Sequence, residues 1–331
     1  MSELDPLLNR ITRLTTTTGI FQHSKLDLAD PIHGYALEDQ ARALIISHEF
    51  GQKDLSEIYL EFMAKAKRKD GLLYQYYYEH IGFKSNTFKK ATIASNEAFG
   101  ICLWALYKTN NQNYSPRIKS IIKNLEKNAS DWTAPRSLAA ALIGLSQTEK
   151  PKKLEKTLLK VLKEHFSDCH QPNWEWFENY LAYANAILPW ALWEIFLKRN
   201  DLEAKNIAEK TTKFLIETCQ ENGIPGPIGN KGWYLKGEEK ALYDQQPIDP
   251  GYMVCCLEKA YLATKDEYYL SWAKKWWGWF FGNNLKKVSL VTTSNSCYDA
   301  LTQNGPNLNS GAESNICFLM AFLAAKRLKL A

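Results

Sequence analysis

The feature that most constrains this sequence is a helical spacing of apolar residues that continues along almost the whole chain. Apolar side chains recur at i, i+3, i+4 and i+7, as on one face of an α-helix, in stretches separated by helix-ending signals. These stretches predict twelve helices, at residues 4–17, 37–50, 53–68, 93–109, 115–127, 134–147, 151–165, 177–198, 202–221, 248–264, 267–281 and 311–328. Strands are expected only as short pieces of the longer connections, at residues 74–78, 232–235 and 288–292. The chain is therefore predicted to be all-α.

The predicted helices alternate between two kinds. Helices near residues 53, 115, 151, 202 and 267 are amphipathic with a lysine-rich face, which suits one packed side and one side in water. Helices near residues 37, 93, 134, 177, 248 and 311 are apolar nearly all round and rich in small residues, which suits burial on most sides. With residues 4–17 as a sixth outer helix, the alternation predicts a closed (α/α)6 toroid, formed by residues 1–331 as a single domain. An open helical solenoid is the alternative, but its units would share a motif at a fixed period, and here the inner helices begin at unequal intervals.

Composition and motifs exclude several classes of protein. The 41 Lys and Arg against 36 Asp and Glu give a net charge of only +5, too weak and too evenly spread for a nucleic-acid-binding surface. The 7 cysteines show no paired C-x-x-C spacing, so neither a disulfide framework nor a zinc site is expected. No stretch approaches the roughly 20 apolar residues of a membrane span, and the N-terminus lacks the pattern of a secretion signal. No phosphate-binding glycine motif and no pair of histidines at i, i+4 occurs. We therefore expect a cytoplasmic protein without a metal or other cofactor.

Polar and aromatic residues gather just before each inner helix or in its first turn. They occur in the segments 34–42, 95–97, 131–136, 174–179, 244–249 and 309–314, which in a closed ring would all face one mouth. Helix capping and the helix dipole explain any single carboxylate there, at about 0.3 to 1 kcal/mol each. They do not explain the glutamine pair 245–246 or the tryptophans at 174 and 176. Aromatic rings beside carboxylates suit a sugar-binding cleft, because a pyranose offers a C–H face for stacking and hydroxyls for hydrogen bonds.

At these residues the sequence resembles a known family. The motifs are Gly34-Tyr35-x-x-Glu38-Asp39-x-Ala41-Arg42, Trp176-Phe177-Glu178-Asn179, Asp244-Gln245-Gln246-Pro247-Ile248 and Gly311-Ala312-Glu313-Ser314. In this order they resemble the six-hairpin glycosidase-like (α/α)6 domains found beside, or fused to, bacterial glycosyltransferases. The resemblance implies the same toroid fold, a carbohydrate-active site and possible association with a glycosyltransferase.

The chain departs from the family pattern at two places. The first motif of the family carries two aspartates followed by Asn, where this chain has Glu38-Asp39-Gln40, which preserves a carboxylate pair. The family has Asp where this chain has Ala184, so one acid of the cavity is missing.

Carboxylates are the candidate catalytic groups. A glycosidase needs one protonated carboxyl for the leaving oxygen and one ionised carboxylate to activate water, about 6.5 to 9.5 Å apart in an inverting enzyme. Asp39 and Asp244 are the leading candidates, and Glu178 and Glu313 are the next pair. The residues expected to stack on the sugar or to bind its polar groups are Tyr35, Glu38, Arg42, Arg136, Trp174, Glu175, Trp176, Tyr183, Asn185, Gln245 and Gln246. The sequence thus predicts a glycoside hydrolase that acts on a small or oligomeric saccharide.

Two other functions stay open. Ala184, and the lack of a predicted region of alternating strands and helices, favour a non-catalytic glycan-binding or interaction module that serves a separate glycosyltransferase. A sugar isomerase would need histidines as proton carriers, and only His33 lies close to a motif.

Overall fold

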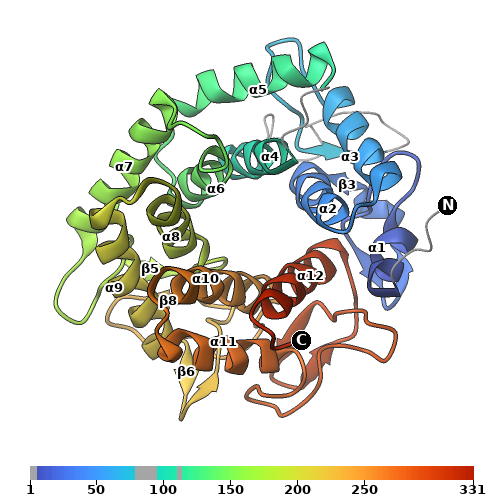
Figure 1. Cartoon of the computed structure of the whole chain (residues 1–331). Coiled ribbons are helices and arrows are strands. Elements are labelled where there is room, and N and C mark those ends of the chain that lie inside the picture. The colour runs from blue at the N-terminus through green and yellow to red at the C-terminus, as the bar shows by residue number, and fades with distance from the viewer. Residues whose placement is uncertain (1–5, 79–94, 110–113) are drawn as a thin grey trace. The chain divides into compact units, whose positions relative to one another are not determined.

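The computed structural model describes residues 6–78, 95–109 and 114–331, and most of the regular structure in these ranges is helical (Figure 1). Twelve α-helices lie in this described part of the chain, and the strands there form only short antiparallel pairs. The chain divides into two units, Met1–Leu159 with Gly311–Ile316, and Lys160–Ser310 with Cys317–Ala331. The all-α prediction is confirmed, whereas a single domain of residues 1–331 stays a prediction.

In the first unit, helix α4 lies at the centre of the packing. It packs against α2 and α6, while α3 covers α2 and α5 covers α4 (Figure 1). The helices of this unit are α1 (Asn9–Leu14), α2 (Leu37–Glu49), α3 (Lys53–Lys65), α4 (Asn96–Thr109), α5 (Pro116–Ala129) and α6 (Pro135–Leu145). The 3-10 turns η1 (Pro6–Leu8) and η2 (Pro31–His33) and the strand pairs β1 (Ser24–Lys25) with β2 (Leu28–Ala29) and β3 (Tyr35–Ala36) with β4 (Tyr76–Tyr77) complete it.

In the second unit, α8 and α10 pack on each other. Helix α9 covers α8, and α11 covers α10. The helices are α8 (Ile187–Arg199), α9 (Leu202–Thr218), α10 (Ile248–Thr264) and α11 (Glu267–Trp279), and α7 (Lys153–Cys169) and α12 (Ala312–Arg327) are each shared between the units. The strand pairs are β5 (Tyr180–Leu181) with β8 (Tyr234–Leu235), β6 (Gln220–Glu221) with β7 (Ile224–Pro225), and β9 (Ala300–Thr302) with β10 (Gly305–Asn307). No helix of the described residues is both long and apolar enough to traverse a bilayer.

Most predicted helices differ from the structure by up to four residues at an end, and two differ more in their form. The helix predicted over 177–198 begins only at Ile187, because the preceding residues form β5 and Ala184 adopts a left-handed backbone with φ of 50°. The helix predicted over 4–17 is only α1 preceded by η1. It ends because Thr15, the first of four consecutive threonines, is extended and forms a β-bridge with Ile20. Residues 4–5 and 93–94 of the predicted helices lie outside the described residues.

Helix ends distinguish the two kinds of helix. The amphipathic helices α5, α9 and α11 each have a side-chain cap at their start. The capping side chains, those of Ser115, Asp201 and Asp266, accept hydrogen bonds from backbone N–H groups of the first turn. The helices α2, α4, α6, α8, α10 and α12, here called the buried helices, are mostly buried along their lengths. The N-cap residues of α2, α6, α8 and α10 provide no side-chain cap; they are Ala36, Ala134, Ala186 and Pro247. The amides at these four helix starts therefore rely on other groups.

Small residues let the buried helices approach closely. A Cβ atom added to Gly144 of α6 would lie 2.7 Å from the Cα of Trp104 in α4. One added to Gly100 of α4 would lie 2.6 Å from the carbonyl oxygen of Ser137 in α6. In the second unit, a Cβ atom added to Gly251 of α10 would lie 2.8 Å from the carbonyl oxygen of Cys317 in α12. These contacts leave no room for a side chain.

A buried ion network is an exception to the apolar character of α8, α10 and α12. Glu194 and Glu258 are both buried, and Lys259 Nζ lies 3.4 Å from Glu194 Oε1 and 3.7 Å from Glu258 Oε2. Arg327 Nη2 donates to Glu258 Oε2 at 2.9 Å. Each buried carboxylate therefore has a cationic partner, as burial of charge requires.

We expect Gly144→Ala to destabilise the protein by about 1 to 3 kcal/mol. The added methyl group would collide with the backbone of α4, which cannot move away as a flexible side chain could. The free energy of unfolding in urea measures the effect. Gly226→Ala is the control, since its Cβ would meet only the side chain of Leu285, at 3.6 Å. If Gly144→Ala is instead stabilising, as alanine is at an open helix position, the close packing of α4 and α6 is wrong.

Candidate functional site

Four acidic residues of the first unit lie in the first turns of buried helices. Glu38 and Asp39 begin α2, Glu97 begins α4 and Glu313 begins α12. Negative charge at a helix N-terminus interacts favourably with the helix dipole. Asp39 is only 5% exposed, whereas Glu38 and Glu97 are half-buried and the side chain of Glu313 is 40% exposed. The structure thus gathers in one unit three carboxylates singled out in the sequence, together with Glu97.

Arg42 joins two of these carboxylates. Its Nη1 donates to Glu313 Oε2 at 2.9 Å and lies 3.5 Å from Asp39 Oδ1. The guanidinium is buried, so its charge is little screened by water. One cation, one turn beyond Asp39 on α2, therefore connects α2 to the start of α12 and partly neutralises both acids.

Glu38 has a strongly raised pKa. Burial raises the pKa of Glu38 to about 7, and the charges of Glu313 and Glu97 add to the rise, against the lowering effect of a backbone hydrogen bond and Arg42. The carboxyl is thus close to half protonated at neutral pH, so it can both give and take a proton there.

Gln75 holds the Glu38 carboxyl in place. Its Nε2 donates to Glu38 Oε2 at 2.5 Å, and its Oε1 accepts from the backbone N–H of Ser95 at 2.9 Å. Its backbone carbonyl also accepts from Leu37 N at 2.9 Å, which serves the uncapped start of α2. Sequence reasoning missed Gln75, because only the tertiary structure brings the strand segment 74–78 to the first turn of α2.

Tyr76 lies close enough to Glu38 for the charge of that carboxyl to affect its pKa. Burial raises the pKa of Tyr76 to about 12, and the charge of Glu38 is the next largest cause. Tyr76 is half-buried, so its phenol is a further polar group near the candidate acid.

In the second unit, Glu178 and Asp244 lie in two connections that precede buried helices. Glu178 is buried, accepts from the hydroxyl of Tyr180 at 2.7 Å, and its carbonyl oxygen accepts from the indole N–H of Trp174 at 2.7 Å. Asp244 is half-buried with a left-handed backbone, φ 61°, and its carbonyl oxygen accepts from the backbone N–H of Asn230 at 3.0 Å.

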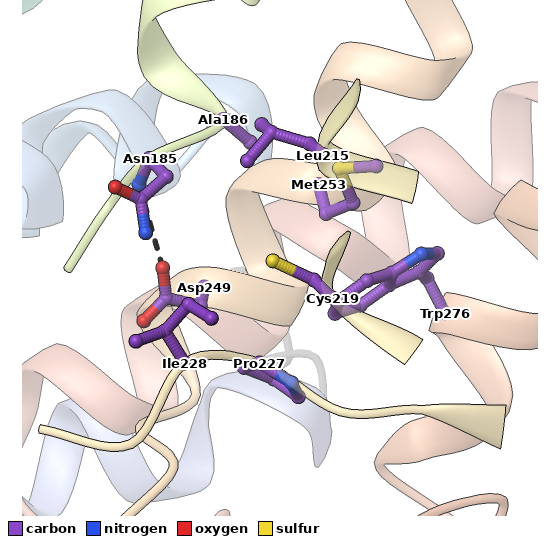
Figure 2. A pocket seen from close by; sticks show the side chains of 9 residues that line it. All are labelled: Asn185, Ala186, Leu215, Cys219, Pro227, Ile228, Asp249, Met253 and Trp276. Atoms are coloured by element: carbon purple, nitrogen blue, oxygen red, sulfur yellow. Dashed lines mark hydrogen bonds between the residues drawn. The ribbon is translucent and has the colours of Figure 1, made fainter. Parts of the chain in front are cut away.

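A small cavity of this unit lies beside the starts of α8 and α10 (Figure 2). The residues that line it are Asn185, Ala186, Leu215, Cys219, Pro227, Ile228, Asp249, Met253 and Trp276. With a volume of about 10 Å³ it has room for one water molecule and none for a sugar.

Asp249 is the carboxylate of this cavity. Its Oδ1 accepts from the backbone N–H of Asn185 at 3.4 Å, and its charge, after burial, helps to raise the pKa of Cys219 to about 12. The amide group of Asn185 bonds both backbone groups of Ala182, at 3.1 and 3.0 Å. Asp249 and Asn185 therefore support the start of α8. The sequence placed Asp249 in the polar segment 244–249 but gave it no role.

Three aromatic residues expected to stack on a sugar are packed inside the protein. Tyr35 stacks on Phe21 with ring centroids 4.4 Å apart, and Trp176, which is 0% exposed, stacks on Phe214 at 6.0 Å. Trp174 is buried edge-on against the same Phe214. These three rings pack against neighbouring rings and have little exposed surface, so their predicted role in stacking on a sugar stays a prediction. Tyr183, in contrast, is half-buried.

The other predicted binding residues have diverse surroundings. Gln245 is 0% exposed; its Oε1 accepts from the indole N–H of Trp279 at 3.0 Å and its Nε2 donates to a backbone carbonyl at 2.7 Å, so its amide serves the structure. Gln246 is half-buried, and Arg136 is buried in the first turn of α6. Glu175 lies 3.6 Å from both a lysine and a histidine.

None of the described histidines lies in the first turn of a buried helix, although His33 ends η2 four residues before α2 begins. His23 and His33 are exposed and meet edge to face at 4.9 Å, and His48 is in the last turn of α2. His165 is on α7 and His170 directly follows it. Among the described residues, no group of three or more His, Cys, Asp or Glu side chains could hold a metal ion. The acidic groups described in the first turns of the buried helices are carboxylates.

Comparison with known proteins gives the fold. No protein-family model and no curated protein sequence matches the chain. A D-mannose isomerase structure matches with a TM-score of 0.74 at 11% identity, over 97% of this chain and 96% of that one. Cellobiose 2-epimerase from Bacillus thermoamylovorans B4167 matches with 0.71 at 11% identity, over 96% and 95%. The GH76A alpha-1,6-mannanase from Salegentibacter sp. HEL1_6 matches with 0.65 at 10% identity, over 98% of both chains.

These structures share the six-hairpin glycosidase-like (α/α)6 toroid fold, and the chain has it too. The predicted toroid, and not the open solenoid, is therefore confirmed. Identities near 11% show the fold alone.

We expect the stability of the wild-type protein to fall, relative to Glu38→Gln, as the pH rises from about 4.5 through 7. The folded state binds the Glu38 proton more tightly than the unfolded state, with a pKa of about 7 against 4.5. Protonated Glu38 therefore stabilises the folded state fully below pH 4.5, and this stabilisation is lost as the pH rises through about 7. The change in the free energy of unfolding should be about 1 to 3 kcal/mol. Urea denaturation of both proteins between pH 4.5 and 8 measures it. Parallel stability curves would contradict the raised pKa.

Proposed function

We propose that the protein is a carbohydrate-active enzyme, and specifically a glycoside hydrolase that acts on a small or oligomeric saccharide by carboxylate acid–base chemistry. The observation that carries the proposal is Glu38, a half-buried carboxyl with a pKa of about 7, beside the Arg42-bound carboxylates of Asp39 and Glu313. Cleavage of a glycosidic bond needs a carboxyl still protonated near neutral pH and a second, ionised carboxylate.

Within the first unit, we assign the proton donor to Glu38. Asp39, the candidate favoured by the sequence, is only 5% exposed and faces Arg42, which leaves it little surface for a substrate. Glu313 is the best candidate for the ionised partner, because its side chain is 40% exposed and pairs with Arg42 at 2.9 Å. Asp39 then serves to position Arg42. Glu178 and Asp244 of the second unit stay candidates for a separate role.

The comparisons support a saccharide substrate, since the similar structures are named as a mannose isomerase, a cellobiose epimerase and a mannanase. They also favour a second candidate function, sugar epimerisation or isomerisation. In that chemistry a base removes a proton from carbon, and a carboxyl with a pKa of about 7 could act as the base. A non-catalytic glycan-binding module, association with a glycosyltransferase and a cytoplasmic location stay predictions.

We expect Glu38→Gln to lower kcat/KM at least 100-fold on the best saccharide of a panel of di- and oligosaccharides, because general acid catalysis contributes about 10² to 10⁴. Release of reducing ends measures turnover. Wild-type kcat/KM should also fall above about pH 7, where Glu38 loses its proton. The control is Glu61→Gln on α3, an exposed carboxylate paired with Lys65, which should keep wild-type turnover. Full activity in Glu38→Gln would remove Glu38 from the mechanism.

Proton NMR of the same incubations in D2O separates the candidate functions. New reducing ends identify a hydrolase, whereas deuterium at C2 of an uncleaved sugar identifies an epimerase or isomerase. Binding by calorimetry without either change identifies a non-catalytic module.

A further inference from the structure

Trp233 is an exposed aromatic residue in a backbone conformation that aromatic residues rarely adopt. It is 39% exposed and has φ of 59°, in the left-handed region. Its N–H donates to the carbonyl of Gly229 at 3.1 Å, and its carbonyl accepts from the N–H of Ala241 at 2.9 Å. A Cβ atom on Gly229 would lie 1.9 Å from the carbonyl oxygen of Tyr243. The two segments of this connection therefore pack so closely that only glycine fits at position 229. The surrounding chain therefore imposes the unusual conformation, a cost that proteins tend to bear at ligand-binding positions.

The indole ring of Trp233 is held on two sides. Its Nε1 donates to Asn230 Oδ1 at 3.1 Å, and the ring stacks on that of Tyr180, with centroids 6.1 Å apart and planes 18° apart. Tyr180 lies in β5, which pairs with β8 directly after Trp233. An aromatic ring fixed before binding loses little conformational freedom when a ligand arrives.

One end of this arrangement connects to the carboxylate of Glu178, and the other connects to the backbone of Asp244. The hydroxyl of Tyr180 donates to Glu178 Oε1 at 2.7 Å. The backbone N–H of Asn230, whose side chain holds Trp233, donates to the carbonyl of Asp244 at 3.0 Å. The aromatic pair is thus built into the same part of the second unit as two acids that the sequence singled out.

We infer that the Tyr180–Trp233 pair is a stacking subsite that binds one pyranose ring of an oligosaccharide, next to Glu178 and Asp244. A pyranose fits this surface because its C–H face can lie on the indole while its hydroxyls reach carboxylate and amide oxygens. Trp174 and Trp176 have little exposed surface for such stacking, since both are buried. The subsite deepens the proposed function and rests on it: the substrate is a saccharide of at least two units, not a monosaccharide.

The test is calorimetric titration with glucose, mannose, and β-1,4-linked gluco- and α-1,6-linked manno-oligosaccharides of two to six units. Wild-type affinity should rise with chain length in at least one series. Trp233→Ala should lower the affinity for the longer members about tenfold and flatten the dependence on length. Trp233→Phe and Tyr180→Phe keep a ring at each position and should keep most of that dependence. Phe281→Ala is the matched control, because Phe281 is an exposed aromatic residue of the same unit, packed on Trp277.

The outcomes separate the subsite from the proposed function. The same length dependence in Trp233→Ala as in the wild type would overturn the subsite and leave the proposed function in place. An equal loss in Phe281→Ala would also overturn it, because the effect would then be general. A wild-type protein that binds and converts no saccharide of the panel would overturn both. Circular dichroism and melting temperature, measured for every variant, show that the compared proteins are folded.

Discussion

The rest of this structure depends on the close packing of the buried helices. Where Gly144 meets α4 and Gly251 meets α12, backbone approaches backbone and leaves no space for a side chain. Interiors packed to this density admit few polar groups unless they are paired, as in the network around Glu258. Acidic side chains therefore gather at the helix starts, where the helix dipole favours negative charge.

The neighbours of each acid at the helix starts determine its ion pairing and its pKa. Arg42 is the cation that allows Asp39 and Glu313 to lie together, and Glu38 remains outside that pairing, bonded to the neutral amide of Gln75. Because a neutral donor offsets less of the cost of burial than a cation does, the pKa of Glu38 rises to about 7. Glu38 and Asp39 are neighbours in sequence, yet Glu38 bonds a neutral amide whereas Asp39 lies beside a buried cation.

The tryptophans of the second unit differ in exposure: Trp174 and Trp176 are buried, whereas Trp233 is exposed. Trp174 and Trp176 fill the space under the connection before α8, where ring packing stabilises the loop that carries Glu178. Trp233 belongs to the connection before α10 and is held at the surface by Tyr180 and Asn230. Residues of one type therefore act as core in one connection and as exposed surface in the next.

The sequence by itself determined the helices, their alternation and most of their ends. Apolar spacing and caps such as Ser115 and Asp201 act within a few residues, so a local pattern suffices to predict them. It also located the acids at the helix starts. Only the tertiary structure decided which acid has a raised pKa and which rings are exposed, because Gln75 reaches Glu38, and Glu313 reaches Arg42, across long separations in sequence. Burial and pKa arise from such distant neighbours, and no local pattern records them.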